Sequence, residues 1–296
     1  MSIRTASDTE YANISWIPTG LNKLDAILGG GIPTRRITEI SGPFSVGKTT
    51  LALMVFARAQ QEKYKTLWCD FEWSWEHDYP QSLGVDLKKT LLIQERFAET
   101  AIDDVEEWAE KNKNGLIVVD AIGAMLPRAE AEKGSEGKTI GGQAGLVAKF
   151  CRKVTPLLVQ NNIAMIVLNH EFTDIMSGRI MTSGGKKLEH AKAIWLKLRK
   201  VSKNVMQGEN KVGEIIEAEI RKNKLAPTMR QTAELTLIFG KGFSAEADLL
   251  QELLDSGEVT KVGQKYFRNG VIMGRGITQA REWLKNNVTD VGRGNH

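Results

Sequence analysis

The feature that most constrains this 296-residue chain is a short glycine-rich segment between a predicted strand and a predicted helix. Residues 42–49 read GPFSVGKT and fit the pattern G-x-x-x-x-G-K-[ST]. The glycines let backbone N–H groups curl around phosphate oxygens, and the start of the helix adds partial positive charge. The apolar run Ile37–Ile40 precedes the segment, and an amphipathic run from Thr49 to Gln61 follows it. The segment therefore predicts a nucleotide phosphate site inside an α/β fold.

Nucleotide contacts are expected along this loop at Gly42, Pro43, Ser45, Val46, Gly47, Lys48, Thr49 and Thr50. Within the set, Lys48 would reach the outer phosphates and the Thr49 hydroxyl would ligate Mg²⁺. Asp120 ends an apolar strand and would hold the same Mg²⁺ through water. The sequence therefore predicts ATP and Mg²⁺ as cofactors. The alternative for Asp120 is a strand-end acidic residue without a metal.

A triphosphatase also needs a group that orients the attacking water. Glu72 follows the strand at residues 66–69, so it would emerge at the carboxyl end of that strand, beside the phosphates. A carboxylate at this place can position water for in-line attack. The residues alone leave open whether Glu72 is this base or a surface glutamate.

Short apolar runs alternate with amphipathic stretches through the middle of the chain. Strands are expected at residues 37–40, 66–69, 116–119 and 164–168, and helices at 49–61, 101–111 and 145–160. Continuous apolar strands separated by helices indicate a parallel sheet that is covered on both faces.

Beyond Ile194 the pattern changes to alternation, which predicts antiparallel strands at one edge of the sheet. These strands are expected at residues 214–220 and 233–239, followed by a helix at 245–257, a hairpin at 266–270 and a last helix ending near 287. The segments 130–142 and 171–185 are rich in Gly, Ser, Thr and charged residues. Loops of this length in a compact domain are usually functional or disordered.

Composition excludes several classes of protein. Hydrophobic residues make up 42% and charged residues 26%, as in ordinary globular proteins, and no run is apolar for long enough to span a bilayer. The N-terminus lacks the apolar core of a signal peptide, so a cytoplasmic protein without a membrane partner is expected. Cys69 and Cys151 lack CxxC spacing, which argues against zinc or a disulfide framework. A net charge of +4 is compatible with nucleic-acid binding without requiring it.

Taken together, the motifs resemble the RecA-like recombinases over about residues 17–287. The landmarks are TGLNKLD at 19–25, GGG at 29–31, EISGPFSVGKTT at 39–50, DFE at 70–72, LGVD at 83–86, VVD at 118–120, KNK at 222–224 and WLK at 283–285. The resemblance implies an α/β fold, with a RecA-type P-loop ATPase core and a mostly parallel central sheet at residues 17–243. A short N-terminal oligomerisation arm would occupy residues 1–16, and a small truncated C-terminal lobe residues 244–296.

The resemblance also implies the function. It predicts an ATP-dependent recombinase that forms a helical homopolymer on single-stranded DNA and catalyses homologous pairing and strand exchange with double-stranded DNA. ATP hydrolysis would be stimulated by DNA. By matching position, Glu72 would be the catalytic carboxylate, and Lys222 and Lys224 would reach across the subunit interface to the γ-phosphate.

Further roles follow from the same matches. Tyr79 falls where the family contacts adenine, and Phe239 where a neighbouring subunit supplies an aromatic ring. His170 stands where the family has a glutamine that senses the γ-phosphate. Two loops, at about 128–145 and 170–186, would hold DNA. Apolar wedges between bases are expected at Ile140 and Ile175, and phosphate contacts at Arg152, Ser183, Gly184, Gly185 and Lys186. The alternative for both loops is plain disorder.

The chain departs from the family pattern in several places. The second loop is a few residues shorter, Phe172 and Asp174 replace basic residues there, and Gly145 replaces an arginine near the first loop. His190 replaces an interface aromatic residue. The N-terminal helix and the acidic tail of the family are expected to be missing. Such trimming suits a phage-encoded member that acts at the nucleoid, in the host cytoplasm.

Two other functions remain open at this point. A RecA-fold ring helicase or similar motor would use the same phosphate loop and a cation from a neighbouring subunit. A recombination mediator would bind ATP with little turnover, and the presence of Glu72 argues against it.

Overall fold

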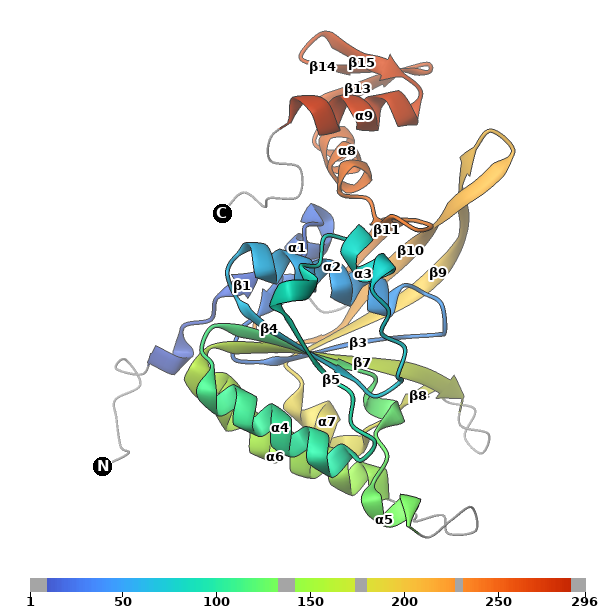
Figure 1. The fold of residues 1–296 in the computed structure, drawn as a ribbon. Helices are drawn as coiled ribbons and strands as arrows, with labels where there is room; N and C mark the ends of the chain where they lie inside the picture. Colours follow the sequence, from blue (N-terminus) through green and yellow to red (C-terminus); the bar gives the residue numbers. More distant parts are fainter. Residues whose placement is uncertain (1–9, 133–141, 174–179, 227–230, 289–296) are drawn as a thin grey trace.

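A long sheet forms the centre of the molecule in the computed structural model, which describes residues 10–132, 142–173, 180–226 and 231–288 (Figure 1). Across the sheet the strands are β12 (Gly242–Phe243), β11 (Thr232–Ile238), β10 (Asn210–Asn223), β9 (Ile194–Gln207), β3 (Ile37–Gly42), β7 (Ile163–Thr173), β6 (Gly115–Asp120), β4 (Lys65–Asp70) and β5 (Thr90–Ile93). Strands β9 to β5 are parallel, and β9 to β12 are antiparallel. The mostly parallel α/β core with an antiparallel edge is confirmed.

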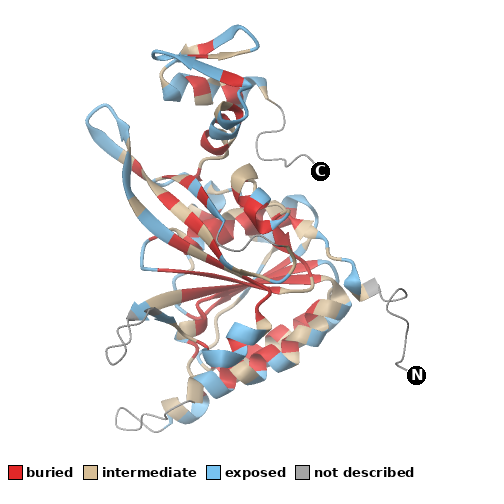
Figure 2. Ribbon diagram, turned by 180° about the vertical axis from the view of Figure 1, so that it is seen from behind, coloured by how far each residue is buried: buried red, intermediate tan, exposed pale blue. Residues whose placement is uncertain are grey.

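Helices cover both faces of the sheet (Figure 1). On one face lie α1 (Asn22–Leu28), α2 (Lys48–Gln61) and α3 (Asp78–Ser82); on the other lie α4 (Ala98–Lys111), α6 (Gly142–Asn161) and α7 (Gly185–Ala191), with α5 (Arg128–Ala131) beyond them. Strand side chains alternate between the two resulting cores. On the α2 face, the ring of Trp68 meets Phe56 edge-on at 5.5 Å, and on the other face Val119 packs in one cluster with Phe150. Figure 2 shows the buried residues concentrated on the strands and on the inward sides of the helices.

The C-terminal segment forms a small unit with its own core. It comprises α8 (Ala245–Asp255), β13 (Val259–Val262), β14 (Lys265–Arg268), β15 (Val271–Arg275) and α9 (Ile277–Asn287). Its core contains Leu250, Tyr266 and Leu284. Ser244 caps α8 by accepting a hydrogen bond from the backbone N–H of Ala247 at 3.1 Å, and a lysine of α1, Lys23, pairs with Asp255. The boundaries of the arm, the core and the lobe stay predictions.

Several elements differ from their predicted limits. Helix α4 begins at Ala98 and α6 at Gly142, three residues earlier than predicted in each case. Strand β7 continues to Thr173 and pairs with β8 (Ile180–Thr182), while α5 occupies residues 128–131. Helices and strands therefore occupy both ends of each segment that was predicted to be a DNA loop. The sequence did not predict them, because polar strand ends and short helices carry little apolar signal. Of the described helices, none has the length and apolar character of a membrane span.

Candidate functional site

The phosphate loop connects β3 to α2, as predicted. Gly47 has a φ of 94°, and a side chain there would meet the ring of Phe243 at 3.0 Å, so only glycine suits the position. Lys48 is buried and donates hydrogen bonds to the carbonyls of Gly42 at 3.0 Å and Pro43 at 2.9 Å. Burial lowers the pKa of the Lys48 ammonium, and the carboxylates of Asp120, Glu72 and Glu171 partly oppose that change. The ammonium is therefore held over the loop, where phosphate oxygens could accept its hydrogen bonds.

Thr49 and Asp120 lie together at the predicted magnesium site. The Thr49 hydroxyl donates to Oδ2 of Asp120 at 3.1 Å, and Asp120 is the last residue of β6. Burial, reinforced by the nearby carboxylate of Glu72, raises the pKa of Asp120 to about 7. Hydroxyl and carboxylate oxygens are the donors that Mg²⁺ prefers, and a cation would offset the buried charge. The residues present therefore fit the metal that the sequence predicts.

Glu72 and His170 meet beside the phosphate loop. Glu72 follows β4, and its Oε1 lies 2.8 Å from Nε2 of His170, near the end of β7. Strand pairing sets His170 opposite Gly42, the first residue of the loop. The proposed hydrolytic base and the proposed γ-phosphate sensor are thus in direct contact, which the sequence did not predict.

Tyr79 lies on α3, and its hydroxyl is 2.8 Å from the hydroxyl of Thr50. A cavity of about 70 Å³ lies here, lined by Tyr79, Thr49 and Asp120 among others. Phe239, just after β11, is half exposed and lines a groove of about 560 Å³ with Lys241 and Arg281. The structure therefore places Tyr79 beside the phosphate loop, and Phe239 on a separate groove.

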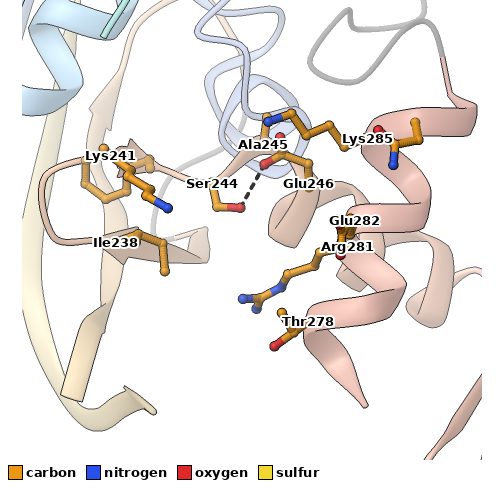
Figure 3. Close-up of a pocket in the computed structure, with 12 residues that line it drawn as sticks. Ile238, Lys241, Ser244, Ala245, Glu246, Thr278, Arg281, Glu282 and Lys285 are labelled. Atoms are coloured by element: carbon orange, nitrogen blue, oxygen red, sulfur yellow. Dashed lines mark hydrogen bonds between the residues drawn. The ribbon is translucent and has the colours of Figure 1, made fainter. Parts of the chain in front are cut away.

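A further groove, of about 610 Å³, lies between the residues after β11 and helix α9 (Figure 3). Lys241, Glu246, Arg281 and Lys285 line it, and none of the residues predicted to bind nucleotide does.

Lys222 and Lys224 lie away from the phosphate loop of their own subunit. Asn223, between them, pairs with Ile194, and Ile194 pairs with Thr38 near the start of β3. The loop leaves the other end of β3 after Gly42, roughly 13 Å further along the strand. The ammonium groups instead donate to the carbonyls of Glu189 and His190 at the end of α7, the second at 2.7 Å. Burial, then the neighbouring charges of Lys224 and Lys192, lower the pKa of Lys222.

The predicted DNA contacts fall partly outside the described residues. Ile140, Ile175 and Asp174 are among those that the structure does not describe. Ser183, Gly184, Gly185 and Lys186 lie where β8 leads into α7, and Arg152 is exposed on α6. A Cβ at Gly185 would lie 3.3 Å from that of Ala144, near the start of α6. The ends of the two predicted loops are thus adjacent, and His190 lies in α7 behind the second.

A buried polar cluster behind the site was missed from the sequence. The carboxylate of Glu39, in β3, pairs with Lys192, and both side chains are buried. The amide of Asn169, next to His170, donates to Glu39 at 3.0 Å and to the carbonyl of Ser183 at 2.8 Å. The signal that could have found it is a glutamate inside an otherwise apolar strand. The cluster fixes the end of the second loop against the strand that carries His170.

Comparison with known proteins gives a consistent result. The family model described as the RecA N-terminal domain matches residues 1–244. The chain is 37% identical to Protein RecA of Thermus aquaticus over 273 residues, covering 91% of this chain and 80% of that protein. It is 34% identical to Protein RecA of Streptomyces ambofaciens over 290 residues, covering 97% and 77% of the two chains. With Protein RecA of Nautilia profundicola the identity is 35% over 289 residues, covering 96% and 82%.

Proposed function

The chain belongs to the RecA family, and we propose that it is an ATP-dependent recombinase that polymerises on single-stranded DNA and exchanges strands with homologous double-stranded DNA. ATP hydrolysis would be stimulated by DNA and would use Mg²⁺. The family match favours neither a ring helicase nor a mediator with little turnover.

The observation that carries the proposal is the distance between the phosphate loop and the two lysines, Lys222 and Lys224, that we propose to act on the γ-phosphate. The phosphate loop, Asp120 and Glu72 gather at one end of the sheet, whereas Lys222 and Lys224 lie roughly 13 Å along it from the loop. Cations placed where charge develops on the γ-phosphate accelerate phosphoryl transfer. A neighbouring subunit that brings its Lys222 and Lys224 to this site would complete it, so hydrolysis would depend on polymerisation.

Each group of the site then has a distinct task. Lys48 would leave the carbonyls of its own loop and bind the outer phosphates. Bound Mg²⁺ would neutralise charge between the phosphates, with Thr49 and Asp120 as the residues that hold it. Glu72 would orient the attacking water once its contact with His170 is released.

An open sheet edge supports polymerisation. Strand β5 ends the sheet, so one row of its backbone groups has no neighbouring strand among the described residues. Leu91 and Leu92 on it are 54% and 37% exposed, and both line a groove of about 320 Å³. A strand from another subunit could add to this edge through backbone hydrogen bonds. We propose that residues 2–6 of the N-terminal arm supply that strand; these residues lie outside the described part of the chain.

DNA would bind along the adjacent ends of the two loops. Exposed Arg152 and Lys186 supply positive charge, and backbone N–H groups near Gly184 and Gly185 can contact phosphates. Contacts of this kind read no bases, which suits a protein that must accept any sequence. The roles proposed for Ile140 and Ile175 stay predictions.

The experiment that tests the function combines DNA-stimulated ATP hydrolysis with electron microscopy of the same samples. We expect filaments on single-stranded DNA and hydrolysis that rises with filament content. Glu72→Gln should still form filaments and hydrolyse slowly, because a carboxamide cannot act as a base. Glu110→Gln, an exposed change on α4, is the matched control and should behave like the wild type. Rings instead of filaments, or normal hydrolysis by Glu72→Gln, would contradict the proposal.

A second pair of variants tests the sheet edge. Leu91→Asp places a charge on the exposed edge strand, and Val262→Asp places one on an exposed strand of the C-terminal unit. We expect the first to abolish filaments while single-subunit ATP binding survives, and the second to assemble normally. Equal assembly by both variants would exclude β5 as the docking edge.

A further inference from the structure

An aromatic side chain in the phosphate loop has no role in the function proposed above. Phe44 is 72% exposed, more than the other large hydrophobic side chains described. A ring exposed to this degree removes little apolar surface from water, so the contacts that it makes are more informative than its burial. It lies between Pro43 and Ser45, and its ring centroid is 5.9 Å from the ammonium of Lys48.

The Phe44 ring stacks on the ring of His170. The two centroids are 4.4 Å apart, and the planes are inclined by 22°. Nε2 of His170 lies 2.8 Å from the carboxylate of Glu72, while its buried Nδ1 has no hydrogen-bond partner among the described residues. The ring is therefore oriented by one hydrogen bond and by the stack. Without Phe44, the contact with Glu72 would have to hold the ring alone.

We propose that Phe44 is a positioning residue that holds His170 against Glu72, so that ATP must break the stack before Glu72 is released. The inference rests on the proposed function for the role of Glu72, and it adds Phe44 as a determinant of the response to ATP. We call the stack of Phe44 on His170, together with the hydrogen bond between His170 and Glu72, the resting contact.

The loop geometry explains how ATP would break the resting contact. Lys48 bonds to the carbonyls of Gly42 and Pro43, and Phe44 is the next residue. A triphosphate must draw Lys48 away from both carbonyls, which changes the loop that carries the ring. His170 would then be free to turn toward the γ-phosphate and leave Glu72 to the water.

The resting contact lowers the apparent affinity for ATP, because only subunits in which the stack is broken can bind ATP productively. Stacked aromatic pairs shift an equilibrium roughly two- to twelve-fold. Phe44→Leu should therefore lower the KM for ATP in DNA-stimulated hydrolysis by roughly two- to twelve-fold. Damage to the phosphate loop would raise the KM, so the sign separates a positioning role from a structural one. Phe44→Trp keeps a ring and should keep the KM of the wild type.

Nuclear magnetic resonance of the full chain with labelled histidine gives a readout that does not depend on hydrolysis. The chain has four histidines, and His170→Gln would identify the signal of His170. A stacked ring shifts the ring protons of His170 upfield. Without nucleotide we expect this shift in the wild type and in Phe44→Trp, and its loss in Phe44→Leu. Adding a non-hydrolysable ATP analogue to the wild type should also remove it.

Two results would overturn the proposal: His170 signals that are the same in Phe44→Leu and the wild type, or a KM in Phe44→Leu that is unchanged or raised. Failure of the proposed function is a separate outcome. Normal hydrolysis by Glu72→Gln would show that Glu72 is not the base. The resonance data would still show whether Phe44 positions His170.

Discussion

Asp120 should lower the stability of the free subunit, and Asp120→Asn should therefore raise it. The carboxylate is 3% exposed, and burial together with the charge of Glu72 raises its pKa from 3.8 to about 7. Each pKa unit corresponds to about 1.4 kcal/mol, so the ionised group lowers the free energy of unfolding by about 2 to 4 kcal/mol at neutral pH. An asparagine oxygen can still accept the hydrogen bond from Thr49.

The pH dependence of this gain has a definite sign. Because the folded pKa lies above the unfolded one, the folded state binds the extra proton between about pH 4 and pH 7, and the free energy of unfolding of the wild type falls as pH rises through that window. Asp120→Asn has no carboxyl group at this position, so its free energy of unfolding lacks this pH-dependent contribution. Its advantage over the wild type should be largest above about pH 7 and should disappear near about pH 4.

Urea unfolding without nucleotide or magnesium, at several pH values, measures this difference. Glu110→Gln, an exposed carboxylate-to-amide change on α4, is the control, and it should change the free energy of unfolding by less than about 0.5 kcal/mol. An Asp120→Asn protein that is less stable than the wild type at every pH would refute the reasoning.

Two other outcomes follow from the site. Lys48→Ala should lose most ATP affinity in a direct binding assay, because the loop loses its cation for the outer phosphates. Near-normal binding would show that this loop does not bind the phosphates. DNA affinity should fall steeply with salt and vary little with sequence, and Arg152→Ala and Lys186→Ala should each reduce the salt slope by about one unit or less. Strong dependence on base sequence would contradict backbone binding.

The phosphate loop, Asp120 and the parallel core could be predicted because each rests on local signals. A glycine pattern flanked by an apolar strand and an amphipathic helix predicts the turn between them, and the structure has that turn between β3 and α2. Strand β5 was missed because Thr90–Ile93 is a short edge strand whose leucines are partly exposed. The long β9–β10 hairpin was found only in part, because charged residues interrupt its apolar alternation up to the turn at Gly208.

Contacts between distant segments could not be predicted from the sequence. The stack of Phe44 on His170 joins residues that β3 and β7 bring together, and neither residue has a periodic pattern that would indicate a partner. The match to the family suggested that Lys222 and Lys224 act in a neighbouring subunit. Only the strand register shows that they lie away from the loop of their own subunit.

The central claim, that one subunit completes the site of the next, can be tested by mixing two defective variants. Glu72→Gln lacks the base, and a protein with both Lys222→Ala and Lys224→Ala lacks the cations. In filaments assembled at random from equal amounts of the two variants, about one interface in four combines an intact Glu72 with intact lysines from the neighbour. If the lysines act on the neighbour, the mixture should therefore recover up to about a quarter of wild-type DNA-stimulated hydrolysis. If hydrolysis by the mixture stays at the level of the two separate variants, the lysines do not act across the interface and the account is wrong.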